Sequence, residues 1–342
     1  MAPTAVAVRS PGPSPVSSRP TLIVLEEVAA DQSARSLTLY SVDGKKVASL
    51  PTPTGAQALG ARGDRIFVEE GQQLKAIHGD GTIEDLGPWP FDVNQARFAV
   101  APDGKSWLWG SRTLGKDSTT IDGHVYLGSV TSPMREVAHQ TTPDLPPVPY
   151  EWSARGPVIG HEFGGPGGAE TPFETLSRPP YELLDLTTLA LSPLPDLACN
   201  TATSTALAKT CGSFDQPVAS GARPGEGGVT LTSDSGAKTN LVVPSTDQLG
   251  NLVFSPDGGH FTLESWNGRY DMNGRAVYRS PFGGPIVQVG PSGCDLAAGQ
   301  ASWLAGDSLL ESCLDGFHII GATGDGPVIS TSGTLVGILG GP

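Results

Sequence analysis

The sequence predicts an all-β fold, and three observations lead to that prediction. Short apolar strands with alternating polar residues recur along most of the chain. Tight turns rich in Gly and Pro separate them, which agrees with the 45 glycines and 31 prolines in 342 residues. No segment shows a convincing helical period. With 38% hydrophobic and 16% charged residues, the chain has the composition of a packed domain.

The clearest local signal is a strand, a Pro-Asp-Gly turn and a second strand. It occurs at Phe254–Leu263 and again from Val100 to Trp109, with weaker copies at Ala61–Val68 and Leu304–Leu310. Pro presets φ at the second turn position, and Gly accepts a positive φ at the last. This motif resembles the strand–turn–strand signature of TolB-like and WD40-like (PD40-type) bacterial β-propeller proteins. The resemblance covers most of the chain and implies a single propeller.

The strands then fall into successive groups of short antiparallel segments joined by tight turns. The turn at Asp43-Gly44, for example, joins two alternating strands as a hairpin does. The expected strands are 21–25, 36–40 and 46–50; 56–60, 65–68, 73–77 and 82–86; 96–100, 106–110, 123–128 and 135–138; 150–153, 156–160, 181–185 and 189–192; 201–208, 211–214, 228–233 and 239–244; 251–254, 260–263, 275–279 and 285–289; and 301–304, 309–312, 316–320 and 326–330.

One strand is left over at Gly333–Leu339, and the first group lacks one. We expect this C-terminal strand to be the innermost strand of the first blade, beside Thr21–Leu25, so that it closes the ring and removes exposed sheet edges. The count is then seven blades in residues 21–342, with six or eight as alternatives because the fifth group is poorly marked. Residues 1–20 read as a disordered Pro/Ser-rich tether.

The formal net charge is −14 and the pI is about 4.7. This acidity disfavours nucleic acid and anionic membrane as partners, because both require clustered Lys and Arg. No apolar run is long enough to span a bilayer, so we expect no membrane insertion of the domain. We expect an extracellular or cell-surface domain of a bacterium, monomeric, whose export leader is not present in this chain.

The four cysteines are expected to form two local disulfides, Cys199–Cys211 and Cys294–Cys313, typical of an oxidising compartment. Free thiols are the alternative. A zinc site is disfavoured, because the spacings are not Cys-x-x-Cys and no His is close in sequence.

Four long connections are expected between the second and third strands of consecutive blades, at 111–122, 163–180, 215–227 and 265–274. Equivalent loops share one face of a propeller, and long loops on a rigid scaffold commonly carry function. We expect this face to bind a ligand, with aromatic anchors and polar side chains that orient it. The candidate binding residues are Trp89, Phe91, Tyr150, Glu151, Trp152, His161, Glu162, Phe163, Trp266, Arg269, Tyr270 and Asp271. Trp107, Trp109 and Trp303 lie on strands and are expected in the core.

Signals for catalysis and metal binding are weak. His161-Glu162 lacks further metal ligands at a suitable spacing, no Gly-x-Ser-x-Gly elbow occurs, and the glycine run at 164–168 is not a phosphate loop. We therefore expect no metal and no cofactor. The function predicted is a non-catalytic binding module or scaffold that recognises a protein, peptide or glycan. The alternative is a propeller hydrolase or lyase with its site at the channel mouth on the same face.

Overall fold

The structure is a computed structural model. It describes residues 20–29, 35–53, 55–89, 97–114, 119–143, 146–153, 156–161, 178–193, 211–213, 227–232, 238–243, 248–255, 260–266, 276–281, 285–296, 303–304, 308–322, 324 and 326–340. All the regular elements in these ranges are β-strands. None of the described segments forms a helix long and apolar enough to cross a membrane.

The chain up to residue 193 contains fifteen of these described strands. They are β1 (Leu22–Val28), β2 (Arg35–Ser41), β3 (Lys46–Pro51), β4 (Gln57–Arg62), β5 (Arg65–Glu70), β6 (Gln73–His78), β7 (Ile83–Pro88), β8 (Arg97–Val100), β9 (Ser106–Leu114), β10 (Ile121–Ser129), β11 (Ser132–Thr142), β12 (Pro147–Ser153), β13 (Gly156–His161), β14 (Arg178–Leu184) and β15 (Leu191–Pro193).

The rest of the chain contains the other described strands. They are β16 (Cys211–Ser213), β17 (Gly227–Thr232), β18 (Lys238–Val243), β19 (Gln248–Phe254), β20 (His260–Trp266), β21 (Ala276–Pro281), β22 (Val287–Val289), β23 (Asp295–Leu296), β24 (Leu309–Cys313), β25 (Gly316–Ile320), β26 (Val328–Ile329) and β27 (Thr334–Leu339).

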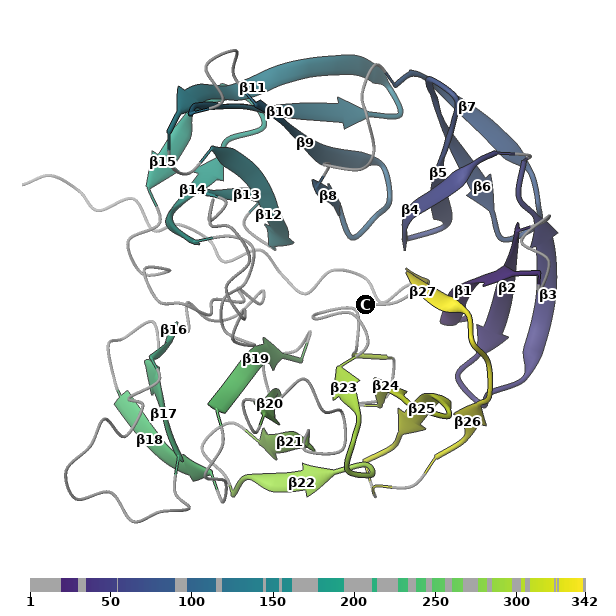
Figure 1. Cartoon of the computed structure of the whole chain (residues 1–342), viewed down its shortest axis with the longest axis vertical. Helices are drawn as coiled ribbons and strands as arrows, with labels where there is room; N and C mark the ends of the chain where they lie inside the picture. The colour runs from purple at the N-terminus through teal and green to yellow at the C-terminus, as the bar shows by residue number, and fades with distance from the viewer. Residues whose placement is uncertain are drawn as a thin grey trace, which may run out of the picture.

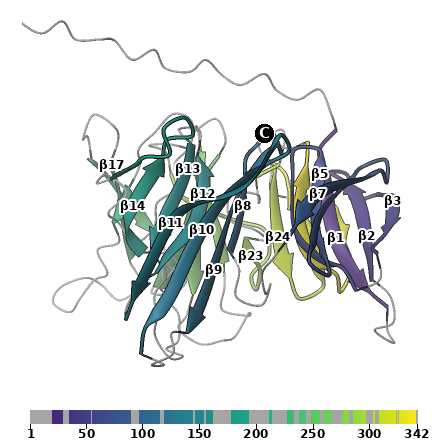
Figure 2. The same cartoon turned by 90° about the horizontal axis from the view of Figure 1, so that it is seen from above.

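The described strands form an all-β architecture of mostly antiparallel sheets around a common centre (Figure 1). One eight-stranded sheet has the order β3-β2-β1-β27-β4-β5-β6-β7. The other sheets follow the chain as β8–β11, β12–β15, β16–β18, β19–β22 and β23–β26. In Figure 1, β4, β8, β12 and β27 lie nearest the centre, and β3, β7 and β11 lie at the rim. Figure 2 shows the long strands of the β8–β11 sheet running through the depth of the molecule.

The predicted pairing of the C-terminal strand with the first strand is confirmed. β27 pairs antiparallel with β1 from Leu22↔Leu339 to Glu26↔Thr334, with a register shift after Val24. The alternation of β27 places Ile338 in one apolar cluster with Ile23 and Leu25, and Leu339 in another with Val24. The strand therefore joins two parts of the core that lie on opposite faces of its sheet.

β27 also contacts β4 in parallel, at Gly337↔Ala61. Gly337 has a φ of 152°, and a Cβ there would lie 2.5 Å from the Ala61 carbonyl oxygen. Only glycine allows the two backbones to approach this closely. The contact between β27 and β4 therefore requires glycine at position 337.

The first Pro-Asp-Gly turn forms as predicted between β8 and β9. Gly104 donates its N–H to the Ala101 carbonyl at 2.9 Å, and its φ is +70°. The Asp103 carboxylate accepts the Lys105 N–H at 2.9 Å. For the second copy, Ser255 N–H donates to the His260 carbonyl at 2.9 Å, while its turn residues 256–259 lie outside the described part. The sequence motif therefore marks a hairpin at both places.

Trp107, Trp109 and Trp303 are buried, which confirms the prediction that they belong to the core. The first two pack with Phe67 and Leu74 between the β4–β7 strands and the β8–β11 sheet. Trp303 packs with Val277, between the β19–β22 and β23–β26 sheets. Aromatic side chains thus fill the space between neighbouring sheets.

The predicted disulfide Cys294–Cys313 is present, with a Cα–Cα distance of 4.3 Å. It joins the residue before β23 to the last residue of β24, so it links two adjacent strands of one sheet. Cys199 and the side chain of Cys211 lie outside the described part, so the second disulfide stays a prediction.

Replacing both Cys294 and Cys313 with alanine is expected to lower the free energy of unfolding by about 2–4 kcal/mol. Urea denaturation measures this, and an unchanged midpoint would contradict it.

The predicted long loop at 111–122 is wrong at both of its ends, while 115–118 lie outside the described part. β9 extends to Leu114, β10 begins at Ile121, and the two strands stay paired up to Leu114↔Ile121. Backbone pairing continues through these polar residues because a strand with one solvated face needs no apolar residue there. The chain thus extends a hairpin at this point, and this extension positions the candidate site. Most of the other three predicted loops, and the strand predicted at 201–208, lie outside the described part. Where the ends of these loops are described, they belong to strands, at 178–180, 227 and 265–266.

Candidate functional site

The candidate site is a group of polar side chains on the extended part of β10 and β11. Asp122, His124 and Tyr126 alternate along β10 and therefore share one face of the sheet. The other face carries Val125 and Leu127, which are buried against the neighbouring β12–β15 sheet. This alternation turns the polar residues of β10 to the side opposite that core.

β11 supplies the partners across the strand pair. His139 lies opposite His124, Thr141 opposite Asp122, and Glu136 opposite Tyr126. Directly opposite residues of an antiparallel pair have Cβ atoms about 5 Å apart, so their side chains meet. We call Asp122, His124, Glu136 and His139 the His–carboxylate cluster.

The two imidazoles of this cluster bind the same carboxylate. Nε2 of His139 lies 2.8 Å from Oδ1 of Asp122, and Nε2 of His124 lies 3.2 Å from Oδ2. The rings are stacked, with centroids 4.2 Å apart and an interplanar angle of 7°. Glu136 lies on their other side, 3.5 Å from Nδ1 of His124 and 3.7 Å from Nδ1 of His139. Two carboxylates therefore enclose a pair of stacked histidines.

The electrostatics of the cluster favour an ionised Asp122. Hydrogen bonds from His139 and from the Thr141 hydroxyl, the latter 2.7 Å long, hold the pKa of Asp122 at about 2. Burial, together with the charges of Glu136 and Asp122, raises the pKa of Tyr126 above its usual value. Asp122 thus offers a full negative charge to the Nε2 atoms of both rings.

A run of aromatic contacts connects the cluster to the core. Trp89 contacts Trp109 at 5.0 Å between centroids, Trp109 contacts Tyr126 at 5.7 Å, and Tyr126 contacts His124 at 6.0 Å. Both tryptophans are fully buried. His124 is therefore held against rigid packing, whereas the side chain of His139 is 46% exposed.

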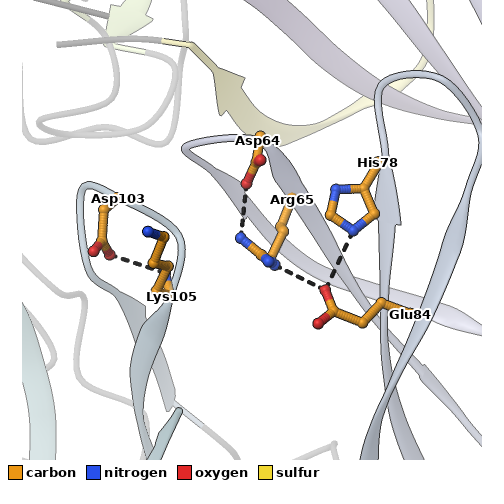
Figure 3. Close-up of polar contacts among 6 residues, drawn as sticks. All are labelled: Asp64, Arg65, His78, Glu84, Asp103 and Lys105. Carbon is orange, nitrogen blue, oxygen red and sulfur yellow. Dashed lines mark hydrogen bonds and ion pairs between the residues drawn. The ribbon is translucent and has the colours of Figure 1, made fainter. Parts of the chain in front are cut away.

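A second polar group lies on the side of the molecule that carries the tight turns (Figure 3). Arg65 donates from Nη1 to Asp64 at 2.8 Å and from Nε to Glu84 at 3.1 Å, and Glu84 also contacts His78 at 3.2 Å. A Cβ at the neighbouring Gly63 would lie 2.7 Å from the backbone of Asp103. This group ties adjacent turns together, so we assign it a structural role.

A third polar group is buried between β20 and β24. Glu311 is 0% exposed, and within the described part neither of its carboxylate oxygens has a hydrogen-bond partner. Burial, with a smaller contribution from the charge of Glu264, raises the pKa of Glu311 to about 8. Since Glu264 is buried as well, this carboxylate pair does not reach a substrate in solvent.

The predicted binding residues are only partly described. Trp89 is fully buried in the aromatic core, so its assignment as a binding residue is wrong: it leaves β7 directly into the space filled by Trp109 and Phe98. The ring of Tyr150 contacts that of Tyr181, with centroids 4.7 Å apart and the planes tilted by 37°. Trp152 packs against the apolar cluster between the β8–β11 and β12–β15 sheets. For two more, Glu151 and Trp266, only the backbone is described. The remaining predicted residues lie wholly outside the described part: Phe91, Glu162, Phe163, Arg269, Tyr270 and Asp271.

His161, one of the predicted binding residues, lies at the same end of its sheet as the cluster does of its own. It ends β13 and lies opposite Pro147, the first residue of β12. A Cβ at Gly123 of β10 would lie 3.3 Å from Cδ of the same Pro147. The end of β13 and the extended part of β10 therefore lie at the same end of neighbouring sheets.

Sequence reasoning missed His124, Glu136 and His139. The available signal was Asp-x-His at 122–124, which places two ligand-type side chains on one face of a strand, followed by a further histidine after a short turn. The predicted strands ended too early, at 138, and began too late, at 123, so that His139 and Asp122 were left in loops.

Chemically, the cluster combines two imidazoles and two carboxylates without a serine or cysteine nucleophile among its four members. Imidazole nitrogen and carboxylate oxygen are ligands for divalent transition metals. The group can therefore hold a cation or exchange protons with a bound partner.

No protein-family model and no curated protein sequence matches this chain. Among solved structures, TolB from Acinetobacter baumannii matches with 14% identity and a TM-score of 0.40, over 78% of this chain and 65% of that one. The tricorn protease matches with 12% identity and 0.45, over 78% and 29%. The Pyrococcus horikoshii acylaminoacyl peptidase matches with 9% identity and 0.43, over 92% and 47%. The chain spans less than two thirds of the length of each of these three proteins, and the similarity is distant.

Proposed function

We propose that this chain is a seven-bladed β-propeller that works as a non-catalytic binding module. Six groups of consecutive strands, from β4–β7 to β23–β26, supply six blades in this proposal. The seventh combines β1, β2 and β3 with β27, and the contact of β27 with β4 closes the ring. The pairing of β27 with both β1 and β4 supports the closure.

The observation that carries the binding function is the position of the His–carboxylate cluster. It lies on the two outer strands of its sheet, at the end that also carries His161, and not on the innermost strand β8. A partly exposed polar group at the rim, away from the innermost strands, suits recognition of a partner. We therefore propose that a protein, peptide or glycan binds over the β8–β11 and β12–β15 sheets and the connections next to them.

The disulfide supports a further part of the proposal, that the domain works outside the cytoplasm. Disulfides persist in oxidising compartments and are rare in the reducing cytosol. An extracellular or cell-surface location in a bacterium agrees with the Cys294–Cys313 bond.

A binding screen tests this function. The untagged protein is applied to glycan and peptide arrays, and each hit is measured by calorimetry with the parent chain and with Trp266→Ala and Asp103→Ala. Trp266→Ala is expected to weaken binding by more than about 1 kcal/mol if this residue is an anchor. Asp103→Ala removes a turn hydrogen bond, so it should lower stability by about 1 kcal/mol and leave the affinity unchanged.

Two results would contradict the proposal. One is turnover of a hit, detected by mass spectrometry, since a non-catalytic module releases its ligand unchanged. The other is an affinity that falls with Asp103→Ala and not with Trp266→Ala, which would place the ligand on the side of the tight turns.

A further inference from the structure

We propose that Asp122, His124 and His139 bind one first-row divalent metal ion of the zinc class. The three protein ligands leave at least one coordination position open for a donor atom of a bound partner. The ion site stands on the geometry alone, whereas the role of the open position rests on the proposed binding function.

The donor atoms are already gathered. One ligand atom from each of the three residues lies within 4.8 Å of the other two. In a tetrahedral zinc site with bonds of about 2.0–2.2 Å, neighbouring ligand atoms are about 3.3 Å apart. The two observed contacts, 2.8 Å from His139 and 3.2 Å from His124 to the Asp122 carboxylate, require only small shifts to reach this spacing.

The surroundings match those of a metal site. Metal-bound histidines usually direct their second ring nitrogen at a carboxylate, which fixes the ring and strengthens it as a ligand. Glu136 lies at 3.5 and 3.7 Å from the Nδ1 atoms of the two histidines, and the Thr141 hydroxyl donates to Asp122. Nδ1 of His124 is buried and makes no hydrogen bond within the described part, so Glu136 is the charged group that faces it.

Binding requires one movement. The rings are parallel, so an ion in the plane of one ring lies outside the plane of the other. His124 is held by its stack on Tyr126, but His139 is half exposed and can turn about its side-chain bonds. We therefore expect His124 and Asp122 to form the fixed part of the site and His139 to close over the ion.

The other two groups of potential ligands in the described part fit less well. Each includes Cys313, and one includes Cys294 as well. Both sulfurs are in the disulfide, so neither offers a thiolate. His318 with Asp315 is then a two-ligand pair, and it provides a matched control.

The first experiment is calorimetric titration of the untagged protein with ZnCl2, NiCl2 and MgCl2. A polyhistidine tag must be absent because it binds the same ions. We expect one zinc and one nickel per chain, and no heat with magnesium, which prefers oxygen ligands. His139→Asn should raise the zinc Kd more than about 100-fold, because loss of an outer partner alone costs about 10–100-fold.

Three further variants sharpen the assignment. Glu136→Gln, a change of an outer partner, should raise the zinc Kd about 10-fold while the melting temperature without zinc stays the same. His318→Asn should bind zinc like the parent chain. His124→Gln provides a second ligand variant, and the melting temperature without zinc shows that each variant is folded.

Electron paramagnetic resonance of the copper(II)-loaded protein identifies the ligands. Two imidazole nitrogens are expected in the parent chain and one in His139→Asn. Equal zinc Kd values for the parent chain and His139→Asn, or no zinc binding up to about 1 mM, would overturn the site.

The array hits separate this inference from the proposed function. A hit that binds only with zinc present supports both ideas. A hit that binds equally well with EDTA supports the module and overturns the role of the open position. Zinc binding with no hit on any array supports the ion site and counts against the proposed function.

Discussion

The Glu311→Gln variant is expected to remove most of the pH dependence of stability between pH 5 and pH 8. In the folded chain burial raises the pKa of Glu311 from 4.5 to about 8. A folded-state pKa above the unfolded value means that the folded chain binds the additional proton. The free energy of unfolding is therefore highest below about pH 4.5, where Glu311 is protonated in both states. It falls as the pH rises towards 8, because only the unfolded chain gives up the proton there. At pH 7 the free energy of unfolding is lower than at pH 4.5 by a value on the order of 3 kcal/mol.

The free energy of unfolding of both chains, measured in urea at half-unit steps of pH, tests this expectation. The parent chain should lose stability steadily over the window, and the variant curve should be nearly flat. Glu182→Gln, a partly exposed carboxylate on β14, is the matched control and should leave the slope of the parent chain in place. Parallel curves for the parent chain and Glu311→Gln would show that Glu311 is ionised when folded.

The environment of Glu311 explains why a titration is expected here and not at an ordinary surface acid. The residue lies on β24 with its side chain against Gly290, where a Cβ would touch the carboxylate carbon at 2.8 Å. The buried Glu264 of β20 adds negative charge nearby. A carboxylic acid in such a space is more stable when it is neutral.

Several features of this fold could be predicted from sequence because they depend on local chemistry. The Pro-Asp-Gly turn at 102–104 requires residues whose φ values are preset or permissive, and it forms the predicted hairpin. β27 could be assigned because one alternating strand was left over while the first group lacked one, and its pairing with β1 is observed. Cys294 and Cys313 could be paired because an even number of cysteines at local spacings favours local pairs. The strand that pairs with β24 is β23 at Asp295–Leu296, so the innermost strand predicted at 301–304 is wrong.

The candidate site could not be predicted in the same way. Asp122 and His139 lie beyond the ends of the predicted strands, since polar residues on a solvated strand give no apolar signal. The prediction places Trp89 on the binding face because it lies in the link into the third group of strands, yet it is buried between the β4–β7 strands and the β8–β11 sheet. Which face a connection residue turns to depends on packing between sheets, and a single sequence does not contain that information.

Deletion of residues 334–342, which removes β27, is expected to unfold the chain or to convert it into aggregates. Leu335 and Ile338 would be lost from one core cluster, and Val336 and Leu339 from another. Burial of an aliphatic side chain stabilises by about 1.5–3 kcal/mol, so the loss is comparable with the whole stability of an ordinary domain. The innermost edges of β1 and β4 would also be exposed, which favours association between chains. Circular dichroism melting and size-exclusion chromatography measure both effects.

A synthetic peptide of residues 332–340 distinguishes a missing strand from general damage. Added in trans, it should restore a cooperative melting transition, whereas a scrambled peptide should not.

A substitution in the full-length chain gives a milder test, because Gly337→Ala brings a Cβ within 2.5 Å of the Ala61 carbonyl oxygen. Gly71→Ala is the control: that glycine also has a positive φ, but no atom lies within 4 Å of its Cβ position. Alanine at either position adds backbone strain of about 1–3 kcal/mol, and the strain is greater at the φ of 152°. A loss in Gly337→Ala beyond this range therefore reports the contact between β27 and β4. Equal melting temperatures for the two variants would mean that this contact does not hold the first and second groups of strands together.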